Sequence, residues 1–168
     1  MNITARKTRL ISWMFVIVGT LFLCALPAAA QGAFGIKAGV SAEPDQFYFG
    51  GQFESDPITD QLRFRPTIEI GIGDNRTLIA VNVEFAYAIP LRNHPWRVFF
   101  GAGPAFNIIS FDDDGPGNGR ATRDDTTTEG GFNILVGLAH RDGLFAEFKV
   151  GALGSPDIKF SVGYSFGR

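Results

Sequence analysis

The sequence predicts an all-β protein in which eight antiparallel strands close into an up-and-down barrel. Three observations carry this prediction. Apolar residues alternate with polar or small ones over most of the chain, turn-forming sequences separate the alternating segments, and the 168 residues include 17 Phe and 21 Gly. Runs of strong helix formers are almost missing after the first 30 residues, so strands dominate the expected secondary structure.

The first 30 residues are expected to be a secretory signal peptide and not part of the fold. Basic residues within 6–9 precede an almost continuous apolar stretch at 10–26, and three alanines at 28–30 form a cleavage site for a signal peptidase. A membrane-anchor helix is the alternative interpretation, but the apolar stretch is short and ends at a processing site. We therefore expect a mature chain of residues 31–168 that forms a single β-barrel domain.

Charge and cysteine content narrow the classes of function. Residues 6–9 hold three of the 15 basic residues, so 12 remain against 17 acidic ones in the mature chain. This balance leaves no basic surplus for binding nucleic acid. The only cysteine, Cys24, lies in the predicted signal peptide, so the mature chain lacks disulfide and thiol chemistry.

Eight segments after residue 33 show the period-two alternation of half-buried strands. Each has about ten residues, the length that a tilted strand needs to cross a bilayer. They cover residues 34–41, 46–54, 62–73, 76–89, 96–110, 130–141, 143–153 and 157–167.

Most connections between these segments are short and rich in turn-forming residues, which suits antiparallel neighbours. They include Glu43-Pro44-Asp45, Asp74-Asn75, Arg141-Asp142 and Ser155-Pro156. The exception is residues 111–129, a polar stretch without periodicity, which we expect to form one long solvated loop.

The alternation gives each strand an apolar and a polar face. In segment 76–89, Val81 and Val83 share the apolar face, whereas Asn82 and Glu84 share the polar one. Glycines gather on the polar face beside long charged side chains. A narrow barrel lumen needs small residues beside long ones, so the polar face is expected to point inward. A soluble barrel with an apolar cavity is the alternative, in which the two faces are reversed.

An inward polar face predicts a network of charged and amide side chains that fills the lumen. A two-residue hairpin at Asp74-Asn75 sets the register of the flanking strands, and it places Arg65 opposite Glu84 and Thr67 opposite Asn82. A buried charge pair must be matched, and further charged residues are expected to extend it into a plug. The predicted lumen residues are Lys37, Arg63, Arg65, Glu69, Asn82, Glu84, Arg97, Glu147, Lys149 and Lys159.

The last predicted strand carries a resemblance to a known family. In residues 159–166, Lys-Phe-Ser-Val-Gly-Tyr-Ser-Phe, aromatic and apolar residues alternate with small or polar ones. Together with the signal peptide, the strand count and the single long loop, this pattern resembles the small eight-stranded outer-membrane barrels of Gram-negative bacteria, typified by the OmpA transmembrane domain and OmpX. The chain departs from the family pattern by continuing after the aromatic residue with Gly167-Arg168.

The resemblance implies a location, a topology and partners. Both termini would lie in the periplasm, and residues 159–166 would be recognised by the outer-membrane assembly machinery. The barrel would contact outer-membrane lipid and lipopolysaccharide. The outer side would hold connections 43–45, 74–75, 111–129 and 154–156, and the periplasmic side 55–61, 90–95 and 141–142.

Signals for chemistry are weak. His94 and His140 are the only side chains with a neutral-pH base, and both are expected beside turns at the periplasmic end, away from a plausible partnership with Ser161 or Ser165. The acidic residues of 111–129 lack the spaced oxygen ligands of a calcium loop. We therefore expect no catalytic, cofactor or metal site and no enzymatic activity.

Three functions remain open. The first is a non-enzymatic outer-membrane barrel that anchors loop 111–129 for a surface, structural or adhesion role, with an extracellular partner at that loop. The second is a narrow gated channel similar to a porin, although an eight-stranded barrel is just wide enough for its own side chains. The third is a soluble periplasmic carrier of a hydrophobic ligand, which requires the apolar face to form the lumen.

Overall fold

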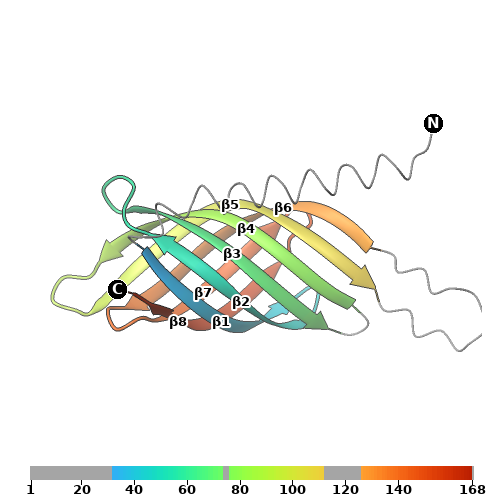
Figure 1. The fold of residues 1–168 in the computed structure, drawn as a ribbon, viewed down its shortest axis with the longest axis horizontal. Coiled ribbons are helices and arrows are strands. Elements are labelled where there is room, and N and C mark those ends of the chain that lie inside the picture. Colours follow the sequence, from blue (N-terminus) through green and yellow to red (C-terminus); the bar gives the residue numbers. More distant parts are fainter. Residues whose placement is uncertain (1–31, 74–75, 112–125, 168) are drawn as a thin grey trace, which may run out of the picture.

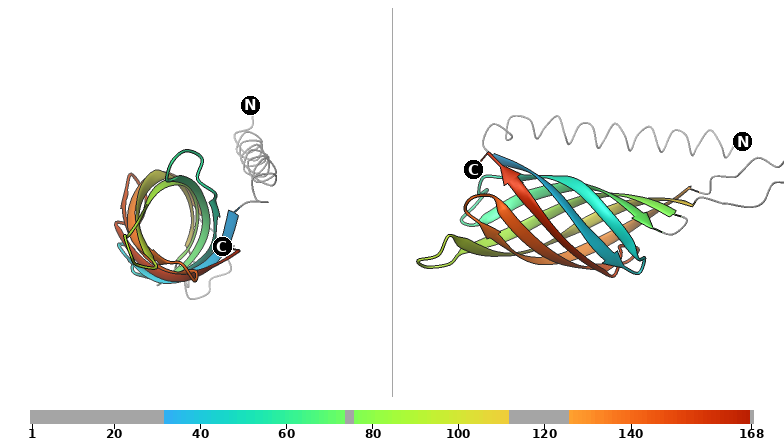
Figure 2. Two further views of the ribbon diagram at one scale, coloured as in Figure 1. Left: turned by 90° about the vertical axis from the view of Figure 1, so that its left-hand side faces the viewer. Right: turned by 90° about the horizontal axis from the view of Figure 1, so that it is seen from below.

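The computed structural model describes residues 32–73, 76–111 and 126–167. Eight antiparallel strands follow one another in sequence order, and the first pairs with the last, so the sheet closes into a barrel (Figures 1 and 2). No helix within these ranges is long and apolar enough to cross a membrane. The strands are β1 (Gly32–Ala42), β2 (Gln46–Ser55), β3 (Leu62–Gly73), β4 (Arg76–Pro90), β5 (Trp96–Phe111), β6 (Thr126–His140), β7 (Leu144–Ala152) and β8 (Ile158–Phe166).

The predicted all-β barrel fold and its eight strands are confirmed, and the predicted strand ends are wrong by more than two residues only in β6. That strand begins at Thr126 and not at residue 130, because residues 126–129 pair with residues 107–110 of β5. The polarity of these residues led us to expect a loop. The end of a paired strand accepts polar residues where it is exposed to solvent, and threonine favours strands.

Several sequence predictions fall on residues outside the described ranges. They are the signal peptide, the turn Asp74-Asn75, the acidic residues within 112–125 and the last residue, Arg168.

The register of β3 and β4 agrees with the prediction from the hairpin. Gly73 faces Arg76 across the strand pair, and further along Arg65 faces Glu84 and Thr67 faces Asn82. Inward-facing residues of β3 therefore lie opposite inward-facing residues of β4, as is required when one face of each strand is buried.

Both termini of the barrel lie at one end, which we call the terminal end. Because successive strands are antiparallel, the connections 56–61, 91–95 and 141–143 also lie there. Figure 1 shows the chain emerging from β8 at this end. The opposite, distal end holds the connections 43–45 and 153–157, together with the strand ends that flank residues 74–75 and 112–125. This grouping matches the predicted grouping of connections.

The outer surface is apolar and the inner face is mostly polar. Large exposed hydrophobic side chains alternate along each strand with buried polar or small ones. Aromatic pairs lie near the terminal end of the barrel: Phe34 with the buried Phe53, Phe64 with Phe85, Tyr87 with Phe100, Trp96 with His140, and Tyr164 with Phe166. The apolar face is therefore not the lumen, which was the condition for a carrier of a hydrophobic ligand.

Candidate functional site

The lumen brings together the ten side chains singled out in the sequence. They project inward from six strands, and eight of them are buried. The other two, Arg63 and Arg97, lie near the terminal end, and the exposed fractions of their side chains are 20% and 17%.

The centre of the lumen is an interlocking set of carboxylates and ammonium groups. The Glu69 carboxylate forms ion pairs with the ammonium groups of three lysines: Lys37 at 2.6 Å, Lys149 at 3.2 Å and Lys159 at 2.7 Å. Lys149 also lies 2.7 Å from Glu84. Because these contacts join β3 and β4 to β1, β7 and β8, this central cluster links strands across the lumen.

Glu147 extends the central cluster toward the terminal end. Its carboxylate lies 3.2 Å from Lys37, 3.4 Å from Lys149 and 3.0 Å from the Arg65 guanidinium. Buried charges are tolerated only when matched and hydrogen-bonded, and here each charge contacts at least one opposite charge.

Amide side chains continue the network across the lumen. Asn82 Nδ2 donates to Thr67 Oγ1 at 2.7 Å, and Asn133 Nδ2 donates to Asn82 Oδ1 at 2.8 Å. This chain links β3, β4 and β6 through groups that are nearly inaccessible to solvent. Such linked buried polar groups reinforce one another when each is satisfied.

Arg65 has different charge partners from the one that the register suggested. Its backbone faces Glu84, but its guanidinium pairs with Glu147 at 3.0 Å and Glu54 at 3.4 Å and lies 4.4 Å from the centre of the Phe99 ring. Glu84 pairs instead with Lys149 from β7. In a narrow barrel a long side chain can reach across the lumen, so strand register identifies neighbours but does not fix partners.

Glu54, a buried lumen residue near the terminal end, is missing from the lumen residues predicted from the sequence. It lies 2.6 Å from Arg97, 3.4 Å from Arg63 and 3.4 Å from Arg65. We define these four residues as the Glu54 cluster. The alternation of β2 could have revealed Glu54, because Gln52 and Glu54 occupy successive positions on the inward face.

A second part of the lumen, beside the charges and near the terminal end, is apolar. The Phe145 ring fills the space that a side chain at Gly163 would occupy, and Phe99 does the same at Gly137. In both cases the aromatic residue and the glycine are cross-strand partners. The members of this apolar layer are Ala86, Ala88, Phe99, Leu135, Ala139 and Phe145.

The distal mouth is narrowed by the connection between β7 and β8. Asn107 Nδ2 donates to the backbone oxygen of Gly154 at 2.7 Å, and Ser155 and Pro156 are buried. A Cβ at Gly131 would lie 2.2 Å from Ser155 Oγ, so glycine is required where the connection folds against β6.

Comparison with solved structures adds a fold assignment. The N-terminal β-barrel domain of Pseudomonas aeruginosa OprF matches with a TM-score of 0.55 at 17% identity, over 81% of this chain and 98% of that one. Neisserial surface protein A matches with a TM-score of 0.55 at 14% identity, over 80% and 91%. This chain has the fold of the small outer-membrane β-barrels.

A third solved barrel is less similar to this chain. The outer membrane enzyme PagL aligns with a TM-score of 0.49 at 12% identity, over 81% of this chain and 99% of that one. No protein-family model and no curated protein matches the sequence significantly.

Within this small outer-membrane barrel fold, neither His94 nor His140 shares the inner face with Ser161 or Ser165. Ser161 and Ser165 are buried on the inner face, whereas His140 packs against the Trp96 ring on the outside, with ring centres 4.7 Å apart. His94 is exposed in connection 91–95. The described residues also contain no group of three or more His, Cys, Asp or Glu side chains that could hold a metal ion.

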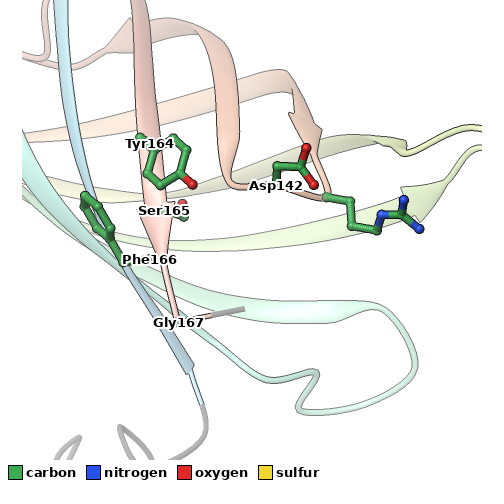
Figure 3. Close-up of a pocket in the computed structure, with 6 residues that line it drawn as sticks. Asp142, Tyr164, Ser165, Phe166 and Gly167 are labelled. Atoms are coloured by element: carbon green, nitrogen blue, oxygen red, sulfur yellow. The ribbon is translucent and has the colours of Figure 1, made fainter.

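A surface pocket of about 450 Å³ lies at the terminal end, between the connection 141–143 and the end of β8. Figure 3 shows Tyr164 and Asp142 on its two sides. The pocket is open to solvent.

Proposed function

We propose that this protein is a non-enzymatic outer-membrane barrel with a closed lumen, which holds its distal connections at the cell surface. The observation that carries the proposal is the filled interior. Ion pairs cross the lumen between β1, β3, β4, β7 and β8, and an apolar layer lies beside them. A barrel of this size leaves no free channel when long side chains occupy it.

An outer-membrane location is supported by the outer surface and by the predicted signal peptide. The exposed apolar side chains would face lipid, and the aromatic pairs near the terminal end would lie at the level of the lipid headgroups. One solved barrel with this fold, Neisserial surface protein A, is a surface protein according to its name. Outer-membrane lipid and lipopolysaccharide are therefore the proposed environment.

The proposed outer-membrane location implies an orientation of the barrel. We place the terminal end in the periplasm, with residues 159–166 of β8 as the segment that the assembly machinery engages. Residues 112–125, the central part of the predicted loop 111–129, would then extend from the distal end into the medium. An extracellular partner, if the protein adheres to one, would bind there.

A narrow gated channel is the second candidate. The polar, charged lumen favours it, because a structural barrel could be filled with apolar side chains instead. Conduction would require the central cluster to separate. The cost of separating buried ion pairs makes the closed state the dominant one.

Cell fractionation tests the location. The folded protein should appear in the outer-membrane fraction, and its gel mobility should change on boiling, as is typical of small folded barrels. Protease added to whole cells should cut within residues 112–125 and leave the connection 56–61 intact. Recovery of a soluble protein from the periplasm without detergent would refute the proposal and favour the carrier.

A further inference from the structure

The ion pairs of the lumen are not balanced. Within the described ranges they join six cations to four carboxylates. The cations are Lys37, Arg63, Arg65, Arg97, Lys149 and Lys159, and the carboxylates are Glu54, Glu69, Glu84 and Glu147. Among these ion-paired groups, the positive charges therefore outnumber the negative ones by two.

The surplus is most accessible in the Glu54 cluster. Three guanidinium groups converge there on one carboxylate, and two of them contact the same oxygen: Arg97 Nη2 at 2.6 Å and Arg63 Nη1 at 3.4 Å from Glu54 Oε1. In the central cluster, by contrast, Lys37, Lys149 and Lys159 are fully buried. Of the ion-paired cations that the structure describes, Arg63 and Arg97 are the ones that remain partly exposed to solvent.

These arginines also retain unused hydrogen-bonding capacity. Arg63 Nη1 donates to the backbone oxygen of Ser55 at 3.1 Å, but the Nε atoms of Arg63 and Arg97 find no acceptor among the described residues. The acidic residues of the adjacent connection, Asp56 and Asp60, are exposed, where solvent and salt weaken their compensation of a buried charge.

We propose that the terminal mouth of the barrel contains a binding site for a small oxyanion, with Arg63 and Arg97 as its ligands and Glu54 as a resident competitor. A guanidinium group presents several N–H donors in one plane, which suits a phosphate or carboxylate group. Glu54 already shows this chemistry, because its carboxylate is held by the same guanidinium groups. A soluble anion would enter the mouth from the surrounding water.

The proposal predicts opposite effects for the two kinds of residue. Arg63→Gln and Arg97→Gln remove donors and should each weaken binding of inorganic phosphate by about tenfold. Glu54→Gln removes the internal competitor and should tighten phosphate binding. Arg92→Gln alters an exposed arginine of connection 91–95 outside the cluster and should leave the affinity unchanged.

Phosphate titration by calorimetry tests these effects on the full barrel in a maltoside detergent, which carries no phosphate. Boiling-dependent gel mobility checks that each variant is folded. Repeating the titration in nanodiscs of phosphatidylcholine and of phosphatidylglycerol separates the two sources of phosphate. Weaker apparent binding only in the phosphatidylglycerol discs would identify the headgroup as the occupant.

Saturable binding that is lost in Arg63→Gln and Arg97→Gln and retained in Arg92→Gln would support the site. The site is refuted if the wild type shows no saturable binding in detergent or phosphatidylcholine discs, or if the two arginine variants bind as tightly as the wild type. Neither result depends on whether the lumen conducts ions or where the protein resides in the cell.

Discussion

Two neighbouring parts of the lumen are filled by different interactions. In the central cluster, Glu69 and Glu147 hold lysines and an arginine from opposite walls. In the apolar layer, Phe99 and Phe145 fill space left by glycines of the neighbouring strand. The central cluster depends on matching charges, so loss of one partner leaves another charge buried without compensation. The apolar layer depends on shape, so added volume is the more disruptive change.

The largest effect is expected for Glu69→Gln, which removes the acceptor charge from three lysines and keeps nearly the same volume. Leaving buried charges uncompensated costs about 3–5 kcal/mol, and the free energy of unfolding should fall by that amount. Urea unfolding in lipid vesicles measures it. Glu129→Gln is the control, because Glu129 lies outside the central cluster, at the distal end of β6, and is only half-buried. Equal stability of the two variants would show that the central cluster does not stabilise the barrel.

Val83→Arg tests the outer face beside the same cluster. Val83 lies near the middle of β4, between the buried residues Asn82 and Glu84 and on the opposite face from them. An arginine facing the middle of a bilayer costs about 2–4 kcal/mol. Val83→Ile should have little effect in the same urea titration. Unchanged folding of Val83→Arg in bilayers would mean that this face does not contact lipid.

Gly163→Ala tests the shape dependence of the apolar layer. A Cβ at residue 163 would lie 2.3 Å from Phe145 Cζ and 2.4 Å from the Ile36 backbone oxygen. Overpacking of this kind costs about 1–3 kcal/mol. Gly51→Ala is the matched control, because its Cβ would come no closer than 3.9 Å to another residue. If both alanine variants unfold at the same urea concentration, the layer is loosely packed.

The smallest effect is expected for deletion of residues 114–123. Polar loops contribute few buried contacts, and shortening a loop changes its closure entropy slowly, so stability should change by less than about 1 kcal/mol. The same unfolding titration measures this change. A shortened chain that cannot assemble would show that the segment is structural.

Strand positions and the two faces could be predicted from the sequence because period-two alternation is a local property. Register across β3 and β4 followed from a single tight hairpin, and Arg65 and Glu84 were correctly placed opposite each other. The start of β6 was wrong because Thr126 to Glu129 carry no apolar signal. Pairing with β5 extends this strand.

The partners of the charged side chains could not be predicted in the same way. Arg65 pairs with Glu147 of β7, and Lys37 of β1 pairs with Glu69 of β3. These contacts cross the lumen between strands that are not adjacent. They depend on barrel diameter and on the reach of each side chain, and neither is written in a local sequence pattern.

Single-channel conductance in planar bilayers tests the closed lumen most directly. In concentrated potassium chloride, the wild-type protein should insert without producing discrete current steps, because the central cluster and the apolar layer leave no continuous water path. Glu84→Ala, which removes a carboxylate at 0% exposure and a 2.7 Å contact to Lys149, should raise the leak. Steady current steps from the folded wild type would contradict a closed barrel and establish the protein as a conduit.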